Sequence, residues 1–358
     1  MRVKYLIYIS LLLLVCLAPQ FLANQKPILE IDSGKWSIPV VEKNYQAKDS
    51  ASFQLYPLIP YSPQYLDADA RNKPPLFKPQ DNAVFTHWLG TDKIGRDILA
   101  GLLSGFKYAI LIGLFAVFPA LIIGTLLGWM SAYYGDDKFK VNPLKLVITF
   151  LLLVLFFYFL FFKFFLLAVL SALALFGMKY WSRERSMRIP LDSIITKLVE
   201  IIQSVPGLLL VLILGAIWGK GWLQISFLIA AVAWTSVSRY VRADVLKLNQ
   251  SDFMLAVEGL GLGKRQVLWH YFINLLPSLK VLAAYGMAGA VFIESGISFL
   301  GLGLSDSTQT WGSMLADARS NLSAWWHLLF PSLCLFFFIF GLHRWARKSN
   351  LKKLPEIG

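Results

Sequence analysis

Long apolar runs, separated by short basic or proline-rich segments, dominate the chain. A membrane-crossing helix needs about 20 mainly apolar residues, and several of these runs reach or approach that length. They cover residues 5–22, 106–130, 144–178, 194–217, 223–241, 278–304 and 326–342. Gly124 and Gly128 in the second run are spaced to let another helix approach closely. The pattern predicts an all-α, polytopic helical membrane protein.

The first apolar run follows Arg2 and Lys4. Basic residues stay on the cytoplasmic side of a membrane, so residues 1–22 are expected to be a transmembrane anchor with a cytoplasmic N-terminus. A cleaved signal peptide is the alternative, although Phe21-Leu22-Ala23 is a poor cleavage site. The polar, proline-rich residues 23–105 should then form a small, irregular extracytoplasmic segment.

The run of residues 144–178 is rich in phenylalanine and has basic residues on both flanks. Both of its ends should therefore be cytoplasmic, which requires an even number of crossings. We expect an inserted apolar hairpin that turns near Lys163, the only charge inside the run. A re-entrant segment is the alternative, because about 17 residues per crossing is the lower limit for a span.

Residues 251–277 are too polar to span a membrane and too regular for a plain connector. Phe253, Ala256, Val257 and Leu260 recur at helical spacing and predict a short helix with one apolar face. Glycines then break the pattern, and a second short amphipathic helix is expected to run until Pro277. Two helices joined by a glycine elbow would make a cytoplasmic docking element.

Composition supports a membrane protein and narrows its function. Hydrophobic residues make up 57% of the 358 residues and charged residues only 15%. The net charge of +13 comes from basic residues beside apolar runs, so membrane topology explains it and nucleic-acid binding is not expected. Cys16 and Cys334 lie inside apolar runs, and the four histidines have no metal-ligand spacing. We therefore expect no metal, cofactor or catalytic site.

Two segments closely resemble signatures of dipeptide and oligopeptide ABC importer permeases. Residues 87–99 are similar to the H-x-L-G-T-D-x-x-G-R-D-x-L segment that precedes the permease core, and residues 294–304 are similar to E-x-x-L-S-F-L-G-L-G. Residues 251–277 resemble the E-A-A loop of such permeases in part, with Ala256 and Gly261 fitting and Leu255 standing in place of Glu. Residues 23–27 and 60–62 resemble the microcin and oligopeptide branch.

The resemblance, which covers most of residues 84–340, implies a fold and a set of partners. It implies a type I permease core over residues 106–345, carrying the inserted hairpin and the cytoplasmic coupling loop 251–277, with a basic cytoplasmic tail at 346–358. The chain would be the permease subunit of an ATP-driven peptide importer in the bacterial inner membrane, with both termini cytoplasmic. Its implied partners are a second homologous permease, two ABC ATPase subunits, an extracytoplasmic peptide-binding protein and membrane lipid.

Three groups of residues are the candidate functional positions. In the coupling loop they are Ala256, Val257, Glu258, Gly259, Gly261, Lys264 and Arg265. In the external segment they are His87, Gly90, Thr91, Asp92, Gly95, Arg96 and Asp97. In the candidate translocation path they are Glu294, Ser295 and Ser298.

Local chemistry gives two of these groups a physical interpretation. Asp92 can cap a helix that lays Ile94, Ile98, Leu99, Leu102 and Leu103 on the membrane surface. Glu294 lies in an otherwise apolar span, where an ionisable group needs water or a partner, so we expect it to face a cavity. Helix pairing through a buried hydrogen bond is the alternative for Glu294.

The sequence also limits the energy source. A phosphate-binding G-x-x-x-x-G-K-[ST] motif is absent, since Gly263-Lys264 is followed by Arg265. ATP hydrolysis is therefore expected in a separate subunit, and the chain itself should not be an enzyme. Two other hypotheses remain at this point: an ion- or proton-coupled transporter with Glu294 as its proton site, and a non-transporting membrane scaffold.

Overall fold

The computed structural model describes residues 19–32, 35–42, 53–79, 85–141, 187–304 and 308–351. The expected hairpin at 144–178, most of the expected anchor and the end of the basic tail lie outside the described residues. The chain divides into two compact units. One comprises Met1–Ile123, Gln203–Val237 and Asn274–Gly358, and the other comprises Gly124–Ile202 and Ser238–Ile273.

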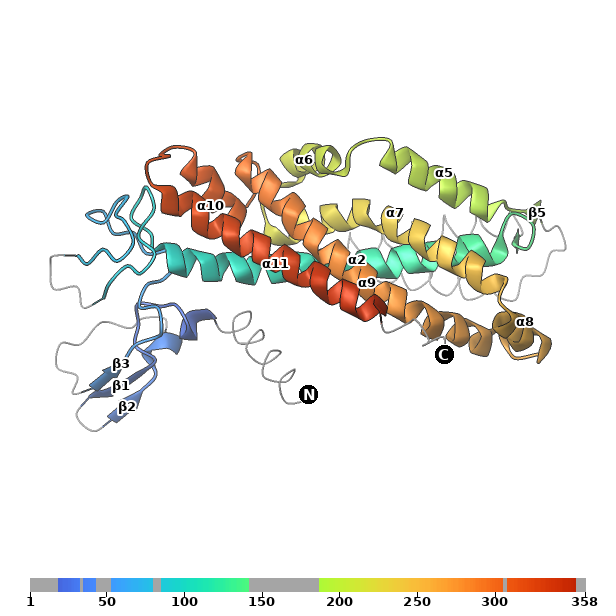
Figure 1. Cartoon of the computed structure of the whole chain (residues 1–358), viewed down its shortest axis with the longest axis horizontal. Coiled ribbons are helices and arrows are strands. Elements are labelled where there is room, and N and C mark those ends of the chain that lie inside the picture. Colours follow the sequence, from blue (N-terminus) through green and yellow to red (C-terminus); the bar gives the residue numbers. More distant parts are fainter. Residues whose placement is uncertain are drawn as a thin grey trace, which may run out of the picture. The chain divides into compact units, whose positions relative to one another are not determined.

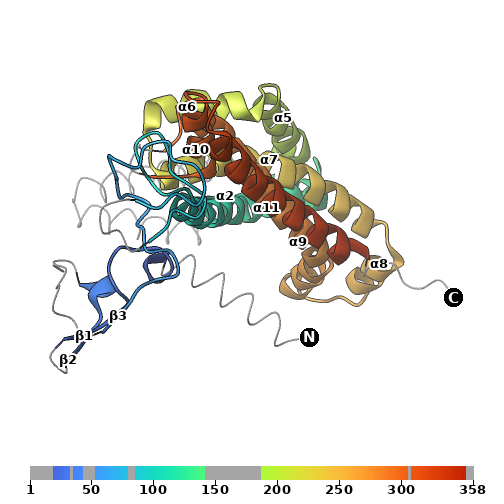
Figure 2. The same ribbon diagram turned by 60° about the vertical axis from the view of Figure 1, so that its left-hand side comes forward.

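Helices make up most of the described chain, as the apolar runs predict (Figure 1). They are α2 (Ile98–Tyr134), α5 (Leu191–Gln203), α6 (Gly207–Trp218), α7 (Trp222–Asn249), α8 (Asp252–Gly259), α9 (Lys264–Phe299), α10 (Trp311–Ala318) and α11 (Trp325–Leu351). Helix α10 lies beside α11, and the two pack together (Figure 2). The chain is thus mainly α-helical.

Short strands, which the sequence patterns did not predict, interrupt this all-helical picture. Strands β1 (Leu29–Asp32), β2 (Lys35–Ser37) and β3 (Phe53–Leu55) form an antiparallel sheet in the order β2-β1-β3. Strands β4 (Lys140–Val141) and β5 (Met187–Arg188) form a second ladder. The external segment also contains the 3-10 turn η2 (Pro39–Val41), and a second such turn, η1 (Pro19–Phe21), lies at the end of the expected anchor. Strands of two to four residues are too short to show a clear alternation of polar and apolar positions.

Three described helices are long and apolar enough to cross a membrane: Ile98–Tyr134, Arg265–Phe299 and Trp325–Lys348. Helices α5 and α6 form a fourth candidate span if they count as one broken helix, and they are bent by 78° at the break. The break lies between Gln203 and Gly207 and contains Pro206. Helix α7 does not reach the same apolarity, because polar residues such as Gln224, Thr235 and Arg239 interrupt it. Its crossing stays a prediction.

Proline does not end the second helix of the loop, contrary to the sequence interpretation. Pro277 lies inside α9, so the loop helix and the following span are one continuous helix of 36 residues. Pro119 and Pro331 are likewise inside α2 and α11. A proline removes one backbone donor, and neighbouring helices and local adjustments can satisfy the freed carbonyl in membrane helices. The prediction that this helix stops at Pro277 is wrong for that reason.

Small residues allow close helix contacts within each unit. In the first unit, a Cβ added at Gly113 would lie 2.6 Å from Met287 Cγ, and one at Gly105 would lie 2.3 Å from Trp311 Cδ1. In the second unit, a Cβ added at Gly128 would lie only 2.4 Å from the carbonyl oxygen of Ser238 on α7. The predicted close approach at Gly128 is confirmed, and it involves backbone, which cannot move aside as a side chain can.

Gly128→Ala should therefore destabilise the protein, by about 1–3 kcal/mol as expected for an overpacked interior. Gly289→Ala on α9 is the matched control, because nothing lies within 4 Å of its added Cβ, and alanine favours a helix over glycine. The measurement is the thermal midpoint of each purified variant in detergent. Equal midpoints for the parent and Gly128→Ala would contradict the close packing of α2 on α7.

Candidate functional site

Residues 87–97 form a tight turn that leads into α2, held by the carboxylate of Asp92. Asp92 Oδ1 accepts hydrogen bonds from the backbone nitrogens of Ile94 at 2.9 Å and Arg96 at 2.8 Å. Asp92 Oδ2 accepts a further bond from Arg96 Nε at 2.6 Å. Gly95 has a φ of +91°, and a Cβ there would overlap the carbonyl oxygen of Asp67 at 1.7 Å. The glycine is thus required by both backbone conformation and space.

The sequence interpretation of Asp92 as a helix cap is wrong, because Asp97 is the residue that caps α2. Asp97 Oδ1 accepts a hydrogen bond from the backbone nitrogen of Ala100 at 2.8 Å, three residues on. Ile98 and Leu102 are buried and pack in the protein interior, so they do not lie on the membrane surface. Both aspartates precede the same apolar run, and the turn around Gly95 decides which of them meets the helix.

His87 is fully buried and braces this cap. Its Nδ1 lies 2.9 Å from Asp97 Oδ2, and its ring stacks on Tyr61 with centroids 4.1 Å apart. The Tyr61 hydroxyl donates to the carbonyl of Phe85 at 2.8 Å. Burial, with the nearby charge of Asp97 as a smaller cause, raises the pKa of Tyr61 to about 12. Tyr61 is therefore a neutral hydrogen-bond donor at every physiological pH.

Ion pairs connect the same turn to α10. Arg96 Nη2 lies 2.9 Å from Asp317 Oδ2, and Lys93 Nζ lies 2.6 Å from Asp317 Oδ1. Arg96 thus contacts two carboxylates, one from its own turn and one from a helix 221 residues away. Two cations and two carboxylates balance in this group. We call residues 87–97 together with Asp317 the external clasp.

The backbone of Thr91 connects the clasp to the first turn of α11. Its carbonyl oxygen accepts hydrogen bonds from Trp326 Nε1 at 3.2 Å and from His327 Nε2 at 2.5 Å. The Thr91 hydroxyl donates to the carbonyl of Ala70 and accepts from the backbone nitrogen of Lys73. Thr91 is fully buried. The carbonyl and the hydroxyl of this one residue thereby fix three parts of the chain to one another.

The structure brings the second group, Glu294, Ser295 and Ser298, together on one buried face of α9. Glu294 is 3% exposed, and its carboxylate accepts hydrogen bonds from Ser298 Oγ at 2.7 Å and Ser295 Oγ at 3.4 Å. A Cβ added at Gly312 would lie 2.5 Å from the carbonyl oxygen of Ser295. Helix α10 therefore covers this face closely, and the acid has polar partners on its own helix.

A cavity of about 390 Å³ opens one helical turn from the acid. It is lined by Ser298, by Lys93, Arg96 and Asp317 of the external clasp, and by Arg319 among others. Glu294 itself is not among the lining residues. The hydrogen bonds from Ser295 and Ser298 to Glu294 lie within α9, so helix pairing and a contribution of Glu294 to a hydrated path both stay predictions.

The coupling loop has the two-helix form that the sequence predicts. Gly261 adopts a φ of +66° between α8 and α9 and makes the bend. The face that α8 buries carries Met254 and Val257, whereas Phe253, Ala256 and Leu260 are exposed. Of the four residues predicted to share one apolar face, only Val257 is buried within the chain. Gly259 and Arg265 are exposed, and the side chains of Glu258 and Lys264 lie outside the described ones.

Tyr271 fixes the second helix of the loop inside its own unit. Its hydroxyl donates to Asn249 Oδ1 at 2.6 Å, and its ring contacts the rings of Trp129 and Tyr133 edge-on. Exposed aromatic and aliphatic side chains remain on the outside of the loop. They are Phe253, Leu255, Leu260, Leu268, Trp269, Phe272 and Ile273. The loop thus has an anchored inner face and an apolar outer face.

An ion pair that sequence reasoning missed supports the same unit. Arg242 on α7 makes two hydrogen bonds of 2.6 Å to the carboxylate of Asp192 at the start of α5. The Ser131 hydroxyl on α2 donates to the same carboxylate. Local spacing gave no sign of this pair, because 50 residues separate the partners.

Comparisons with known proteins agree with these features. Residues 180–350 match the family of binding-protein-dependent transport system inner membrane components, a stretch that includes the loop and Glu294. A protein from Brucella suis that carries the name peptide permease is 29% identical over 281 residues, covering 77% of this chain and 73% of the relative. Dipeptide permease DppC of Alkalihalophilus pseudofirmus is 27% identical, with 72% and 68% covered. Oligopeptide permease OppC of Haemophilus influenzae is 27% identical, with 71% and 66% covered.

Asp317→Ala should loosen the external clasp, because it removes the carboxylate that Lys93 and Arg96 both contact. We expect a loss of about 2–4 kcal/mol, near the range for breaking a buried pair and reduced because Asp317 is partly exposed. Faster proteolysis of the segment before α2 and a lower thermal midpoint would report it. Asp69→Ala, at an exposed aspartate of the same segment, is the control and should behave as the parent. Equal digestion rates for both variants would contradict a role of the clasp in stability.

Proposed function

We propose that this chain is an inner-membrane component of a binding-protein-dependent transport system, the family whose model matches residues 180–350. More narrowly, we propose that it is the permease subunit of an ATP-driven importer of peptides. The observation that carries the peptide assignment is the agreement among its relatives. Proteins named for peptide, dipeptide and oligopeptide transport each align with more than two thirds of this chain. The external motif at 87–99 and the Glu294 segment lie within the region that resembles peptide permeases.

The coupling loop is the element that would receive the energy of ATP hydrolysis. Motion can pass from a partner to the membrane only through a stiff element that contacts both. Helix α9 continues from the loop through Pro277 to Phe299 without a break, so a displacement at Lys264 would act on the span directly. The exposed apolar side chains around Trp269 offer a surface for a partner's groove, as when a helix docks in a groove.

The proposed partners follow from the family and from the topology. They are a second homologous permease, two ABC ATPase subunits and an extracytoplasmic peptide-binding protein, with membrane lipid around the spans. We propose that both termini are cytoplasmic, because basic residues follow α11 and precede the first apolar run. The external clasp then lies on the outer side and the coupling loop on the inner side.

Transport by the assembled complex tests this function. The chain, co-produced with its ATPase, permease and binding-protein partners, is reconstituted in vesicles and supplied with labelled alanine peptides of two to five residues. Uptake that occurs only when ATP is supplied to the ATPase subunits supports the proposal. Uptake driven by a proton gradient without ATP would instead indicate a secondary transporter, and a complex that assembles but moves no peptide would indicate a scaffold.

Glu294→Gln should lower peptide uptake by about tenfold if the carboxylate pairs with a positive group of the passing peptide, because a hydrogen bond to a charged group contributes about 1.5–3 kcal/mol. Glutamine keeps the size of the side chain and can still bond to Ser298, so the complex should assemble normally. Glu200→Gln, at an exposed acid on α5, is the control. Uptake by Glu294→Gln equal to that of the control across the peptide series would leave Glu294 a packing residue.

Gly261→Val should uncouple ATP hydrolysis from transport. A β-branched residue at a φ of +66° is strained, so the elbow must move or straighten and the docking surface is displaced. Gly261→Asn should retain more activity, because asparagine tolerates this conformation better. Gly341→Val on α11, where an added Cβ meets nothing within 4 Å, is the control.

The assays for the Gly261 series are ATPase activity, peptide uptake and subunit stoichiometry of each purified complex. The expected order of uptake is parent, then Gly261→Asn, then Gly261→Val. If all three complexes couple equally well, the loop is only a connector between α7 and α9.

A further inference from the structure

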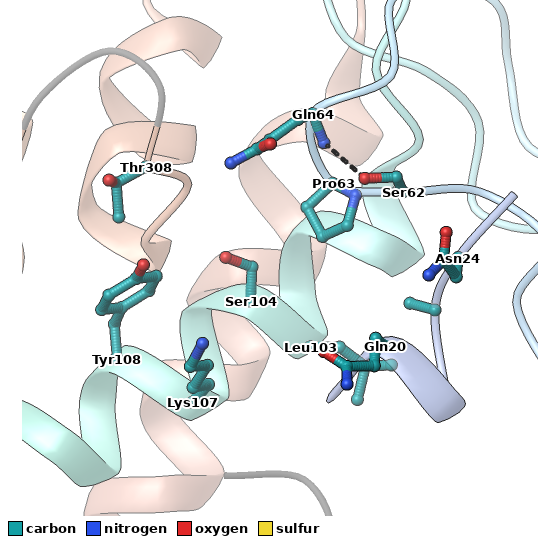
Figure 3. Close-up of a pocket in the computed structure, with 11 residues that line it drawn as sticks. Gln20, Asn24, Ser62, Pro63, Gln64, Leu103, Ser104, Lys107, Tyr108 and Thr308 are labelled. Carbon is teal, nitrogen blue, oxygen red and sulfur yellow. Dashed lines mark hydrogen bonds between the residues drawn. The ribbon is translucent and has the colours of Figure 1, made fainter. Parts of the chain in front are cut away.

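A second cavity, of about 210 Å³, lies beside the first turns of α2. It is lined by Gln20, Ala23, Asn24, Ser62, Pro63, Gln64, Leu103, Ser104, Lys107, Tyr108 and Thr308. In Figure 3 the polar ends of Gln64, Ser104, Lys107 and Tyr108 surround one common space, and Thr308 lies at its edge. These five side chains come from three segments: the external segment, α2 and the stretch before α10. The cavity belongs to none of the three groups of residues identified from the sequence.

The polar groups around this space are mainly hydrogen-bond donors. Lys107 brings an ammonium group, Gln64 an amide nitrogen and Tyr108 a hydroxyl. Within the part of the chain that the structure describes, the Lys107 ammonium makes no ion pair, and its one recorded contact is with the ring face of Tyr108 at 5.5 Å. None of the described lining residues is acidic. Among the described residues, the space therefore holds one positive charge and no carboxylate.

In the neighbouring cavity of about 390 Å³, two of the basic side chains are paired with a carboxylate. There Lys93 and Arg96 both contact the carboxylate of Asp317. Thr308 lines both cavities, so the two are adjacent. Within the described ranges, Lys107 is thus a cation without a carboxylate, next to a site where cations are paired. A cation in a concave donor-lined site favours an anion from outside the chain.

We propose that this cavity binds the terminal carboxylate of a peptide on its way into the membrane, with Lys107 as the charged partner and Gln64 and Tyr108 as additional donors. The proposal rests on the proposed peptide-import function and adds a substrate-contacting site to it. A volume of about 210 Å³ is smaller than the roughly 300 Å³ at which pockets begin to hold a drug-sized ligand, so only one end of a peptide fits. Ala23, Pro63 and Leu103 can contact the last side chain without selecting its charge.

The wall of the cavity is held in place by the fold. Ser104 Oγ donates to the carbonyl of Gln309 at 2.9 Å, which joins α2 to the segment before α10. The Ser62 hydroxyl accepts from the backbone nitrogen of Gln64 at 3.3 Å, which fixes the turn that presents the Gln64 amide. A lipid phosphate would use the same donors, but the apolar lining consists of Ala23, Pro63 and Leu103 and offers no long track for acyl chains. The lining therefore favours a peptide end.

The test compares each alanine peptide with its C-terminal amide in the reconstituted complex. In the parent, uptake of the free acid should exceed uptake of the amide. In Lys107→Gln this ratio should fall about tenfold, the lower end for losing a hydrogen bond to a charged group. Lys107→Arg should keep the ratio, and Lys220→Gln, at an exposed lysine in the turn between α6 and α7, should match the parent. The peptide-binding protein is common to all complexes, so its own preference cancels.

The outcomes separate this site from the function on which it rests. Unchanged acid-to-amide ratios in Lys107→Gln, with ATP-dependent uptake intact, would overturn the carboxylate site and leave the import function standing. The same unchanged ratio together with loss of copurified phospholipid would show that the donors hold a lipid phosphate. Uptake of amide peptides by Lys107→Gln at the parental rate shows that the variant is folded. Failure of the parent to take up any peptide would overturn the proposed function itself.

Discussion

The carbonyl of Thr91 is the point on which the outer end of the first unit depends. A buried backbone carbonyl must find donors, because water is not available to replace them. Here Trp326 and His327 both donate to it, and both lie in the first turn of α11. If either side chain moved away, its own ring nitrogen would lose its hydrogen-bond partner. The bond pair thus fixes the segment before α2 against α11, although 235 residues separate Thr91 from Trp326.

Charge balance around the same turn completes this arrangement. Arg96 is nearly buried and would be unstable there with one partner, because a buried ion needs its remaining donors satisfied. Asp92 supplies one carboxylate from the turn and Asp317 supplies another from α10. Asp97 contacts neither of the two cations. It caps α2 and makes a hydrogen bond with His87. Each acidic residue of the motif therefore has a separate task, which explains why the motif carries two of them.

The sequence predicted the elements whose signal is local. Apolar runs indicated α2, α9 and α11, and glycine with a broken helical period indicated the bend at Gly261. The residues of the external motif were found as a pattern, but the role of capping α2 was assigned to Asp92, whereas Asp97 is the residue that caps the helix. Spacing alone could not decide which aspartate caps the helix, because both precede the same apolar run. The turn at Gly95 that separates them leaves no mark in the spacing. Pro277 was overvalued as a helix end, since a proline removes a single donor.

The remaining residues could not be predicted because their role depends on distant partners. Asp317 and His327 lie more than 200 residues from the atoms that they bind. Asp192 meets Arg242 only when α5 and α7 pack together. Such pairs leave no trace in local periodicity or motif spacing. A search for polar residues beside predicted helix ends would have found Asp192 and His327, but not their partners.

The charged groups near the membrane ends of this chain differ in how fully they are paired with partners. Arg96 has two carboxylates, so it gains little from an outside ligand. Lys107 has only an aromatic ring among the described residues, and a cation–π contact is a weaker partner than a carboxylate. A transporter must bind its cargo and release it, and a single partly solvated cation binds an anion less tightly than a buried pair does. The one-sided charge of the smaller cavity is therefore suited to brief contact with a moving ligand, whereas the balanced charges of the clasp are suited to permanent structure.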